Sequence, residues 1–364
     1  MLASPLYAGQ SARHRCGVRV ITLLVALVVV ATAPALADGA LVPTGAGIST
    51  PAGFRTDVVA KVVRPTALAR DGAGRVWITS ADGSARPTGK VLVLPKLGGQ
   101  PRPVILGLRT PLGLTWFRRE LYVSSTGRVD AYSGFAAGRF TRHRKVIANL
   151  PVGLHQNDAI VPGPDGRLYL GLGSPCDACT PSKSRSATVL SFLPSGRDVR
   201  VVARGLRNPY GLAFVPGSGD LLVTEEGRDD LGLKQPPEEL NVVRAGSPPP
   251  DFGYPRCVGQ GGALCREKTP AFATFPAHAA AGGVVVTAGD FGPVTTPSAF
   301  VALYGSSFRP PTGRHVVRVS LMTPVSTVIF ARGFKNPLAL LMTPNRELLV
   351  GDFTSGRIYR IRPR

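Results

Sequence analysis

A short two-strand unit recurs six times along the chain. Each copy has a turn with Pro or Gly, an apolar strand, a turn rich in Gly, Asp or Pro, and a second apolar strand. The copies begin at residues 65, 111, 158, 209, 282 and 337, and the first three are 46 or 47 residues apart. A period of about 40–50 residues is typical of propeller blades. Since no long stretch shows helical periodicity, the sequence predicts an all-β chain folded as a six-bladed β-propeller.

Further apolar runs lie between the paired strands of these repeats. Residues 91–94, 187–192 and 315–319 are examples, and they would complete four strands in each blade. A stack of β-sandwiches is the alternative architecture, but the regular period favours a propeller, which protects its sheet edges by radial repetition. Binding and catalytic residues are concentrated on loops held by a rigid scaffold. We therefore expect a site in the loops at one mouth of the central channel.

The first 37 residues have the pattern of a secretory signal peptide. Arg13, Arg15 and Arg19 form a basic segment, residues 20–33 are apolar, and residues 35–37 read Ala-Leu-Ala, a cleavage signal. The apolar run is short for an untilted membrane span, although an uncleaved N-terminal anchor is the alternative. We expect a secreted or cell-surface protein with no integral membrane span after cleavage.

Two segments follow the predicted cleavage point. Residues 38–50 are small, polar and rich in Gly, and are expected to be a flexible lead-in. Residues 51–364 are expected to form the propeller.

Four cysteines remain after the predicted cleavage: Cys176, Cys179, Cys257 and Cys265. Two local pairs, Cys176 with Cys179 and Cys257 with Cys265, are the simplest of the three possible disulfide connectivities. A zinc site is the weaker alternative, because Cys-x-x-Cys supplies only half of the four ligands. A redox-active motif is also disfavoured, since neither pair lies in a helical pattern.

The formal net charge is +21, and removing the three arginines of residues 1–37, which contain no acid, leaves +18. A charge of this size is compatible with nucleic acid, an anionic membrane or a cell wall as partner. The basic residues are scattered singly, however, and no nucleic-acid-binding motif is present. We interpret the charge as a generic basic surface and expect no nucleic-acid partner.

The stretch 205–230 carries the strongest indication of a site. Arg207 and Asn208 stand side by side at the edge of an expected strand, and the next strand runs into an acidic loop. The acids of that loop are Glu225, Glu226, Asp229 and Asp230. A cluster of charged residues beside an arginine and an asparagine is not expected in the apolar core of a propeller.

Several pieces of the chain, in this order, resemble a known family. They are G-L-H-Q-N at 153–157, G-L-R-N-P at 205–209, E-E-L-N at 238–241, D-F-G-Y-P at 251–255, P-A-H at 276–278 and G-S-S-F-R at 305–309. The family is the soluble quinoprotein glucose/sorbosone dehydrogenases, also called aldose sugar dehydrogenases. They are six-bladed propellers that bind pyrroloquinoline quinone (PQQ) and calcium, and the resemblance spans residues 51–363.

The resemblance implies that a sugar hemiacetal is oxidised to a lactone, with electrons passing to an external acceptor. His155 matches the family's general base, a role that suits an imidazole. Arg207 and Asn208 match the pair that holds the quinone and orients the substrate, Arg207 being a catalytic as well as a cofactor-binding candidate. Gln156 and Asn336 are further cofactor-binding candidates.

The resemblance also implies two calcium sites. Gly227 and Arg228 match positions whose main-chain carbonyls bind the calcium of the cofactor, and calcium accepts such oxygens readily. Glu239 matches a carboxylate ligand of a second, structural calcium. The redox chemistry would belong to the cofactor, while the protein supplies position and charge.

Three pieces differ from the family pattern. The last blade carries Asn336 where the family has an arginine, and the family motifs H-S-A-P-L-G and G-S-W-N-R read H-A-A-A-G-G at 278–283 and G-S-S-F-R at 305–309. A non-catalytic propeller of the same ancestry, binding carbohydrate or protein, is therefore the alternative function. A calcium-dependent lactonase-type propeller is a weaker one, because the carboxylates cluster on one loop and do not recur across blades.

Overall fold

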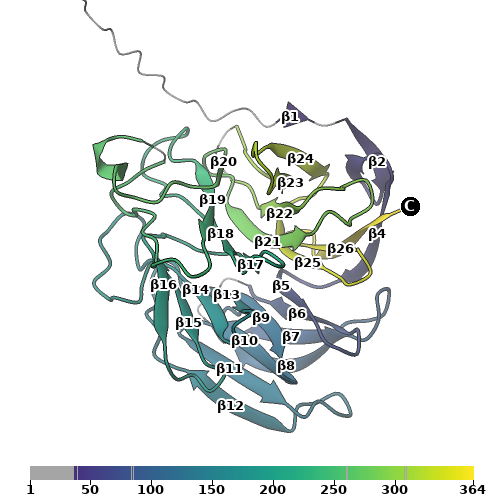
Figure 1. The fold of residues 1–364 in the computed structure, drawn as a ribbon. Helices are drawn as coiled ribbons and strands as arrows, with labels where there is room; N and C mark the ends of the chain where they lie inside the picture. Colours follow the sequence, from purple (N-terminus) through teal and green to yellow (C-terminus); the bar gives the residue numbers. More distant parts are fainter. Residues whose placement is uncertain are drawn as a thin grey trace, which may run out of the picture. The chain divides into compact units, whose positions relative to one another are not determined.

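The structure is a computed structural model that describes residues 37–364 apart from positions 39, 83, 85, 260, 307 and 309. The basic and apolar segments of the predicted signal peptide lie outside the described residues. The strands form six sheets (Figure 1), which we number as blades 1 to 6. The prediction of an all-β six-bladed propeller is confirmed.

The blades follow the chain in order. Blade 1 contains β5 (Pro65–Arg70), β6 (Val76–Ser80), β7 (Gly89–Leu94) and β8 (Arg102–Leu108), and blade 2 contains β9 (Gly113–Phe117), β10 (Glu120–Ser125), β11 (Arg128–Ser133) and β12 (Arg142–Ile147). Blade 3 contains β13 (Asn157–Pro162), β14 (Leu168–Leu172), β15 (Thr188–Phe192) and β16 (Arg200–Arg204), and blade 4 contains β17 (Leu212–Phe214), β18 (Leu221–Glu225), β19 (Glu238–Val243) and β20 (Ala273–Phe275). Blade 5 contains β21 (Ala281–Thr287), β22 (Ser298–Leu303), β23 (His315–Ser320) and β24 (Thr327–Arg332), and blade 6 contains β25 (Pro337–Met342), β26 (Leu348–Asp352), β27 (Arg357–Pro363) and β4 (Phe54–Lys61). All six predicted repeats supply the first two strands of a blade.

The first strands of the blades close a ring. Strand β5 contacts β9, and the contacts continue through β13, β17 and β21 to β25 and back to β5 (Figure 1). Blade 6 joins the two ends of the propeller, because β4 pairs antiparallel with β27, the last strand of the chain. This pairing ties residues about 300 positions apart in the sequence into one sheet.

The segment expected to be a flexible lead-in instead contains a hairpin. Strands β2 (Leu41–Gly45) and β3 (Ile48–Pro51) pair with each other, and β3 pairs with β24 at the edge of blade 5. The short β1 (Ala37–Asp38) also pairs with β24. These strands cover an edge that would otherwise present unpaired N–H and C=O groups, which is the physical reason that a small, polar segment is ordered here.

The hydrophobic core lies between neighbouring sheets. Between blades 5 and 6, a cluster of aromatic rings is completely or almost completely buried: Phe54, Phe291, Phe300 and Phe330. Their centroids are 4.7–5.9 Å apart in tilted and edge-to-face arrangements. Burying each ring contributes roughly 1.5–3 kcal/mol, and Phe54 brings the N-terminal strand into this cluster.

Both predicted disulfides are present, Cys176 with Cys179 in the β14–β15 connection and Cys257 with Cys265 in the β19–β20 connection. The second of these connections contains a 3₁₀ turn, η1 (Ala263–Cys265). Among the described residues, no helix is long and apolar enough to cross a membrane.

The two ends of the ring use different connections. The segments that enter the first strands, and the connections between second and third strands, surround one mouth of the channel. The turns between first and second strands, and between third and fourth strands, therefore lie on the opposite face. Tyr210 closes the channel below the mouth, since its hydroxyl donates across the ring to the carbonyl of Thr66 at 3.4 Å.

Candidate functional site

A cavity of about 1090 Å³ opens at this mouth. Six of the predicted site residues line it: His155, Gln156, Arg207, Asn208, Gly227 and Asn336. Arg228 and Glu239 are not among its lining residues but border a separate cavity of about 30 Å³ behind Gly227. The structure therefore brings the predicted base and quinone-binding residues together. Two of the three predicted calcium ligands, Arg228 and Glu239, do not line this cavity.

His155 is the histidine that the sequence predicts as the base, and it lies in the segment entering β13. Its main-chain N–H donates to the carbonyl of Ser174 at 3.0 Å. A Cβ on Gly173 would lie only 2.3 Å from the Cβ of His155, so a glycine is required for this segment to lie against the end of β14.

The imidazole of His155 is held neutral. Burial disfavours its charged form, the positive charge of Arg207 adds to this, and Asp177 acts in the opposite direction; together they lower its pKa to about 3. Its Nε2 is buried and has no hydrogen-bond partner among the described residues. A neutral imidazole with an unpartnered nitrogen can accept a proton from a ligand hydroxyl.

Arg207 lies in the segment entering β17 and is only 3% exposed. Its main-chain N–H and that of Asn208 both donate to the carboxylate of Glu225. Its guanidinium donates to Asp177 at 2.9 Å and to Asp229 at 2.8 Å. The predicted cation is thus present at the mouth, but two carboxylates already offset its charge.

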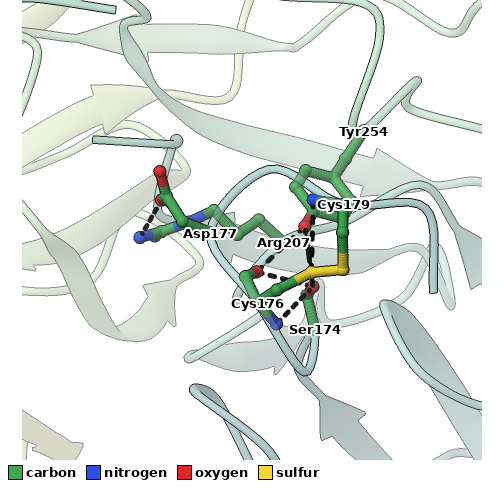
Figure 2. The surroundings of a disulfide bond; sticks show 6 residues. All are labelled: Ser174, Cys176, Asp177, Cys179, Arg207 and Tyr254. Carbon is green, nitrogen blue, oxygen red and sulfur yellow. Dashed lines mark hydrogen bonds and ion pairs between the residues drawn. A yellow bond between two sulfur atoms is a disulfide. The ribbon is translucent and has the colours of Figure 1, made fainter. Parts of the chain in front are cut away.

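The first disulfide positions one of these carboxylates. Asp177 lies inside the four-residue loop closed by Cys176 and Cys179, and Figure 2 shows it directed at Arg207. The hydroxyls of Ser174 and Tyr254 donate to the carbonyl of Cys176 at 2.8 and 2.9 Å (Figure 2). Asp177 also accepts from the N–H of Asp229 at 3.0 Å, so it links the blade 3 and blade 4 loops of the mouth.

Asp177→Asn is expected to lower the free energy of unfolding by about 1–3 kcal/mol, because Arg207 and the N–H of Asp229 lose a charged acceptor. Urea unfolding would measure the change. Asp230→Asn is the matched control: Asp230 pairs with Arg228 at 2.6 Å on the exposed surface, so its loss should change the free energy of unfolding much less. Equal effects of the two substitutions would contradict the linking role of Asp177.

The floor of the cavity carries a buried carboxylate. Thr66, Leu112, Asp158, Tyr210 and Leu338 line it from the starts of five inner strands, and Asp158 is the only charged residue of these five. It is 1% exposed, and its Oδ2 has no hydrogen-bond partner among the described residues. The pairing of β13 with β14 is irregular between Asn157 and Ile160, and such a bulge can redirect a side chain.

Two further carboxylates border the same floor. The pKa of Asp158 is raised well above its usual value, chiefly by burial and then by the negative charge of Glu226. Burial likewise raises the pKa of Glu226, against the opposing hydrogen bond from the Asn208 amide, which is 2.8 Å long. The pKa of Glu238 is raised well above its usual value by burial and by Glu226. The Oδ1 of Asn208 is also buried without a partner among the described residues, so unsatisfied oxygens gather at this floor.

Two of the predicted cofactor-binding residues have structural partners already. The amide of Asn336 donates to the carbonyl of Tyr304 at 3.0 Å and accepts from the hydroxyl of Thr354 at 2.6 Å. The amide of Gln156 donates to the carbonyl of Thr110 at 2.8 Å and accepts from the hydroxyl of Thr126. Both side chains line the cavity while tying neighbouring loops together, and their cofactor-binding role stays a prediction.

The other predicted metal ligands are also engaged. The side chain of Arg228 pairs with Asp230 and donates to the carbonyl of Pro255 at 2.8 Å. Glu239 accepts from the amide of Asn241 at 3.1 Å, and burial raises its pKa. Its role in a second calcium site stays a prediction.

Sequence reasoning missed several residues of the mouth. Asp158 and Asp177 were not singled out, although an acid at the start of an apolar strand and an acid inside Cys-x-x-Cys are both visible in the sequence. Tyr304, Phe308 and Arg314 line the blade 5 side of the cavity. Phe308 lies in the G-S-S-F-R piece at 305–309 that carries the resemblance, whereas nothing in the local sequence of Tyr304 and Arg314 distinguishes them from ordinary loop residues.

Comparison with known proteins identifies the fold, whereas the proteins that match are only distantly related to this chain in sequence. No family model matches the chain. An uncharacterized protein of Borreliella burgdorferi is 22% identical over 355 residues, a match that covers 86% of this chain and 90% of that protein.

Solved structures give the clearer likeness. The holo form of the pyranose dehydrogenase PQQ domain from Coprinopsis cinerea superposes with a TM-score of 0.72 at 17% identity, covering 91% of this chain and 99% of that one. The fold is that of the sugar-dehydrogenase propellers. The PQQ-bound aldose sugar dehydrogenase of Streptomyces coelicolor has a TM-score of 0.68 at 20% identity, with 86% and 99% covered. A calcium structure of a Trichoderma reesei enzyme of carbohydrate-active family AA12 has a TM-score of 0.72 at 15% identity, with 87% and 97% covered. The expected resemblance to soluble PQQ-dependent sugar dehydrogenases is thus confirmed for the fold.

Proposed function

We propose that this chain is an exported oxidoreductase that binds PQQ and calcium at the propeller mouth and oxidises an aldose-type sugar from hemiacetal to lactone. One observation carries the proposal: a neutral, unpartnered imidazole shares a cavity with a buried guanidinium and with unsatisfied buried oxygens. The solved structures that share this fold include PQQ-bound sugar dehydrogenases, which supports the same chemistry here. An external acceptor would then receive the electrons.

The residues present fit a calcium ion. Asp158, Asn208 and Glu226 offer oxygens at one floor, two of them from side chains with unpartnered atoms, and calcium prefers such carboxylate and amide oxygens. The main chain of Gly227 borders the same cavity. The described residues contain no group of three or more His, Cys, Asp or Glu side chains arranged to hold a metal, so these residues make a partial ligand set that other oxygens must complete.

The residues fit the quinone only when a cation accompanies it. Among the described residues, the charged side chains that line the cavity are those of two arginines, Arg207 and Arg314, and four acids: Asp158, Glu226, Asp229 and Glu238. The carboxylates of PQQ would be repelled by this surplus of acids. A divalent cation at the floor removes the repulsion and leaves the arginines to hold the carboxylates.

In this site, His155 takes the proton of the anomeric hydroxyl as the sugar is oxidised. When bound, PQQ supplies the acceptor for the hydride that leaves the sugar carbon. An imidazole with a pKa near 3 is a weak base, but an anionic ligand that offsets Arg207 removes one of the causes of that low value. The pKa of His155 should therefore rise toward the working pH in the loaded site. Arg207 orients the ligand, and Tyr210 separates the cavity from the channel below.

Quinone binding is expected to require calcium. Titration of purified protein with PQQ in calcium buffer, followed by fluorescence quenching, should show saturable binding that EDTA reduces at least about tenfold, since the acids then repel the ligand. Turnover with a panel of aldoses and an artificial electron acceptor tests the activity itself. Unchanged PQQ affinity in EDTA would contradict the calcium requirement.

Absence of both quinone binding and turnover would overturn the proposed function. Sugar binding without quinone binding would instead support the non-catalytic alternative. The uncharged and fully engaged Asn336 favours that alternative, since its amide supplies no cation for the cofactor carboxylates.

A further inference from the structure

A second large groove lies on the face opposite the candidate site. It has a volume of about 1340 Å³ and is lined by the β5–β6 turn, the β9–β10 turn and the β11–β12 connection of blades 1 and 2. Its charged lining is strongly basic: Arg70, Arg75, Arg118, Arg119, Arg142 and Arg144 against Asp71 and Glu120. The propeller fold thus gathers arginines that are scattered in the sequence.

Four of these arginines have no carboxylate partner. Arg75 pairs with Asp71 at 2.6 Å, and Arg144 pairs with Glu120. No ion pair is found in the described part of the chain for the remaining four, which are Arg70, Arg118, Arg119 and Arg142. Arg142 is partly offset, because Glu120, whose pKa is lowered chiefly by Arg144, also feels the charge of Arg142. No carboxylate of the described residues pairs with Arg70, Arg118 or Arg119, so the groove is suited to an anionic ligand.

The β9–β10 turn carries two of these arginines in a backbone conformation that arginine rarely adopts. Arg118 and Arg119 form a two-residue hairpin loop between the paired residues Phe117 and Glu120. Their φ angles are +47° and +67°, the conformation of a type I′ turn, in which Asn-Gly is strongly favoured. Arginines at both positions put two guanidiniums at the groove at the expense of local stability, which is a pattern found at functional sites.

Aromatic rings hold some of the guanidiniums in place. The guanidinium of Arg75 lies 4.9 Å from the ring centre of Phe135, and that of Arg118 lies 5.0 Å from the ring centre of Phe117. Trp116 also lines the groove, and its Nε1 is buried without a hydrogen-bond partner among the described residues. Because this N–H is enclosed by the protein, the exposed donors of the groove are its guanidiniums.

We propose that this groove binds an anionic polysaccharide that bears carboxylate groups. Guanidinium groups bind carboxylates through paired hydrogen bonds, and the hydroxyls of Ser133 and Thr141, which also line the groove, can bond sugar oxygens. The groove is larger than the cavity at the mouth, about 1340 Å³ against about 1090 Å³, so it has room for several sugar units of a polymer. Single-stranded nucleic acid is disfavoured, because it stacks bases on free aromatic faces, whereas arginines cover Phe117 and Phe135 here. The inference does not depend on the chemistry proposed for the opposite mouth.

The test compares binding of polygalacturonate, neutral dextran and oligo-dT to the full chain at physiological ionic strength. Isothermal titration should show binding of polygalacturonate and none of dextran. The double variant Arg118→Asn/Arg119→Gly should bind polygalacturonate at least about tenfold more weakly. Because Asn-Gly suits this turn, the variant should unfold at a temperature no lower than that of the wild type, so loss of binding cannot be attributed to misfolding.

A matched control removes the same charge elsewhere. Arg197→Gln/Arg266→Gln changes two exposed arginines outside the groove and should leave the affinity within about twofold. The proposal is overturned by equal loss in the two double variants, by no binding of polygalacturonate, or by oligo-dT binding more tightly with the same sensitivity to Arg118→Asn/Arg119→Gly.

Discussion

Replacing His155 with alanine is expected to lower kcat for sugar oxidation by about 10²–10⁴, the usual contribution of a positioned general base. PQQ affinity should change by less than about threefold, because the imidazole is neutral and the charges that attract the cofactor lie on other residues. The measurement pairs steady-state turnover with a PQQ titration of the same preparation. A rate loss accompanied by an equal loss of PQQ affinity would show that His155 supports the pocket and does not transfer the proton.

His143→Gln is the control for this substitution. His143 lies on blade 2, at the groove opposite the mouth, and pairs with Asp130 at 2.9 Å. Its loss should leave kcat unchanged within about twofold. Chemical rescue adds a second readout: imidazole in the buffer should restore part of the activity of His155→Ala if only the proton acceptor is missing.

The state of His155 can be followed without turnover. Its pKa is lowered by burial and by Arg207, so the free protein keeps the ring neutral across the range of about pH 5 to 8, in which an ordinary histidine titrates. A group with a lowered histidine pKa contributes stability that is present above about pH 6.5 and is lost as the pH falls toward about 3. An NMR titration showing a midpoint near 6.5 for His155 would contradict this account of the site.

The repeated strand pairs made the fold predictable from sequence. Each copy alternates apolar strand and turn, and a ring of such pairs is the arrangement that buries every sheet against two neighbours. The hairpin of β2 and β3 was not predictable in the same way. Its residues are small and polar, and it is ordered by pairing with the edge strand β24, a partner nearly 300 residues away in sequence.

Site residues that belong to a sequence motif could be predicted, whereas residues whose role depends on their burial in the folded protein could not. His155, Arg207 and Asn208 share one cavity as expected. Asp158 matters because no partner from the described part of the chain reaches its Oδ2, a property that depends on five other blades and cannot be deduced from neighbouring residues. Glu239 follows Glu238 on β19 and borders the smaller cavity behind Gly227, so its predicted role in a second calcium site stays a prediction.

The basic groove illustrates the same limit. Arg70, Arg118 and Arg142 are 48 and 24 residues apart in the sequence, so each looks like an isolated surface charge there. Only the radial packing of blades 1 and 2 brings them to one groove. The interpretation of the charge as generic therefore needs correction at this face, where at least part of it is concentrated.

Asp158→Asn is expected to weaken calcium binding at least about tenfold, because the substitution removes a carboxylate whose Oδ2 has no hydrogen-bond partner among the described residues. In the wild type, calcium offsets the repulsion between Asp158 and Glu226 and should raise the midpoint of thermal unfolding. In the variant, most of that increase should disappear. Isothermal titration with calcium measures the affinity, and thermal unfolding with and without calcium measures the stabilisation. Glu267→Gln changes an exposed position outside the cavity and is the control that should behave as the wild type does.

The direction of the pH dependence follows from the raised pKa values of Asp158, Glu226 and Glu238. A carboxyl whose pKa is raised by folding binds its proton more tightly in the folded than in the unfolded protein. Its contribution to stability is therefore complete below about pH 4 and is lost as the pH rises through the raised pKa. Calcium-free protein should lose stability toward alkaline pH. Saturating calcium should remove much of that loss, because calcium favours the ionised carboxylates. For the same reason, calcium affinity should rise with pH. Calcium binding that is independent of pH and unaffected by Asp158→Asn would place the ion away from this floor.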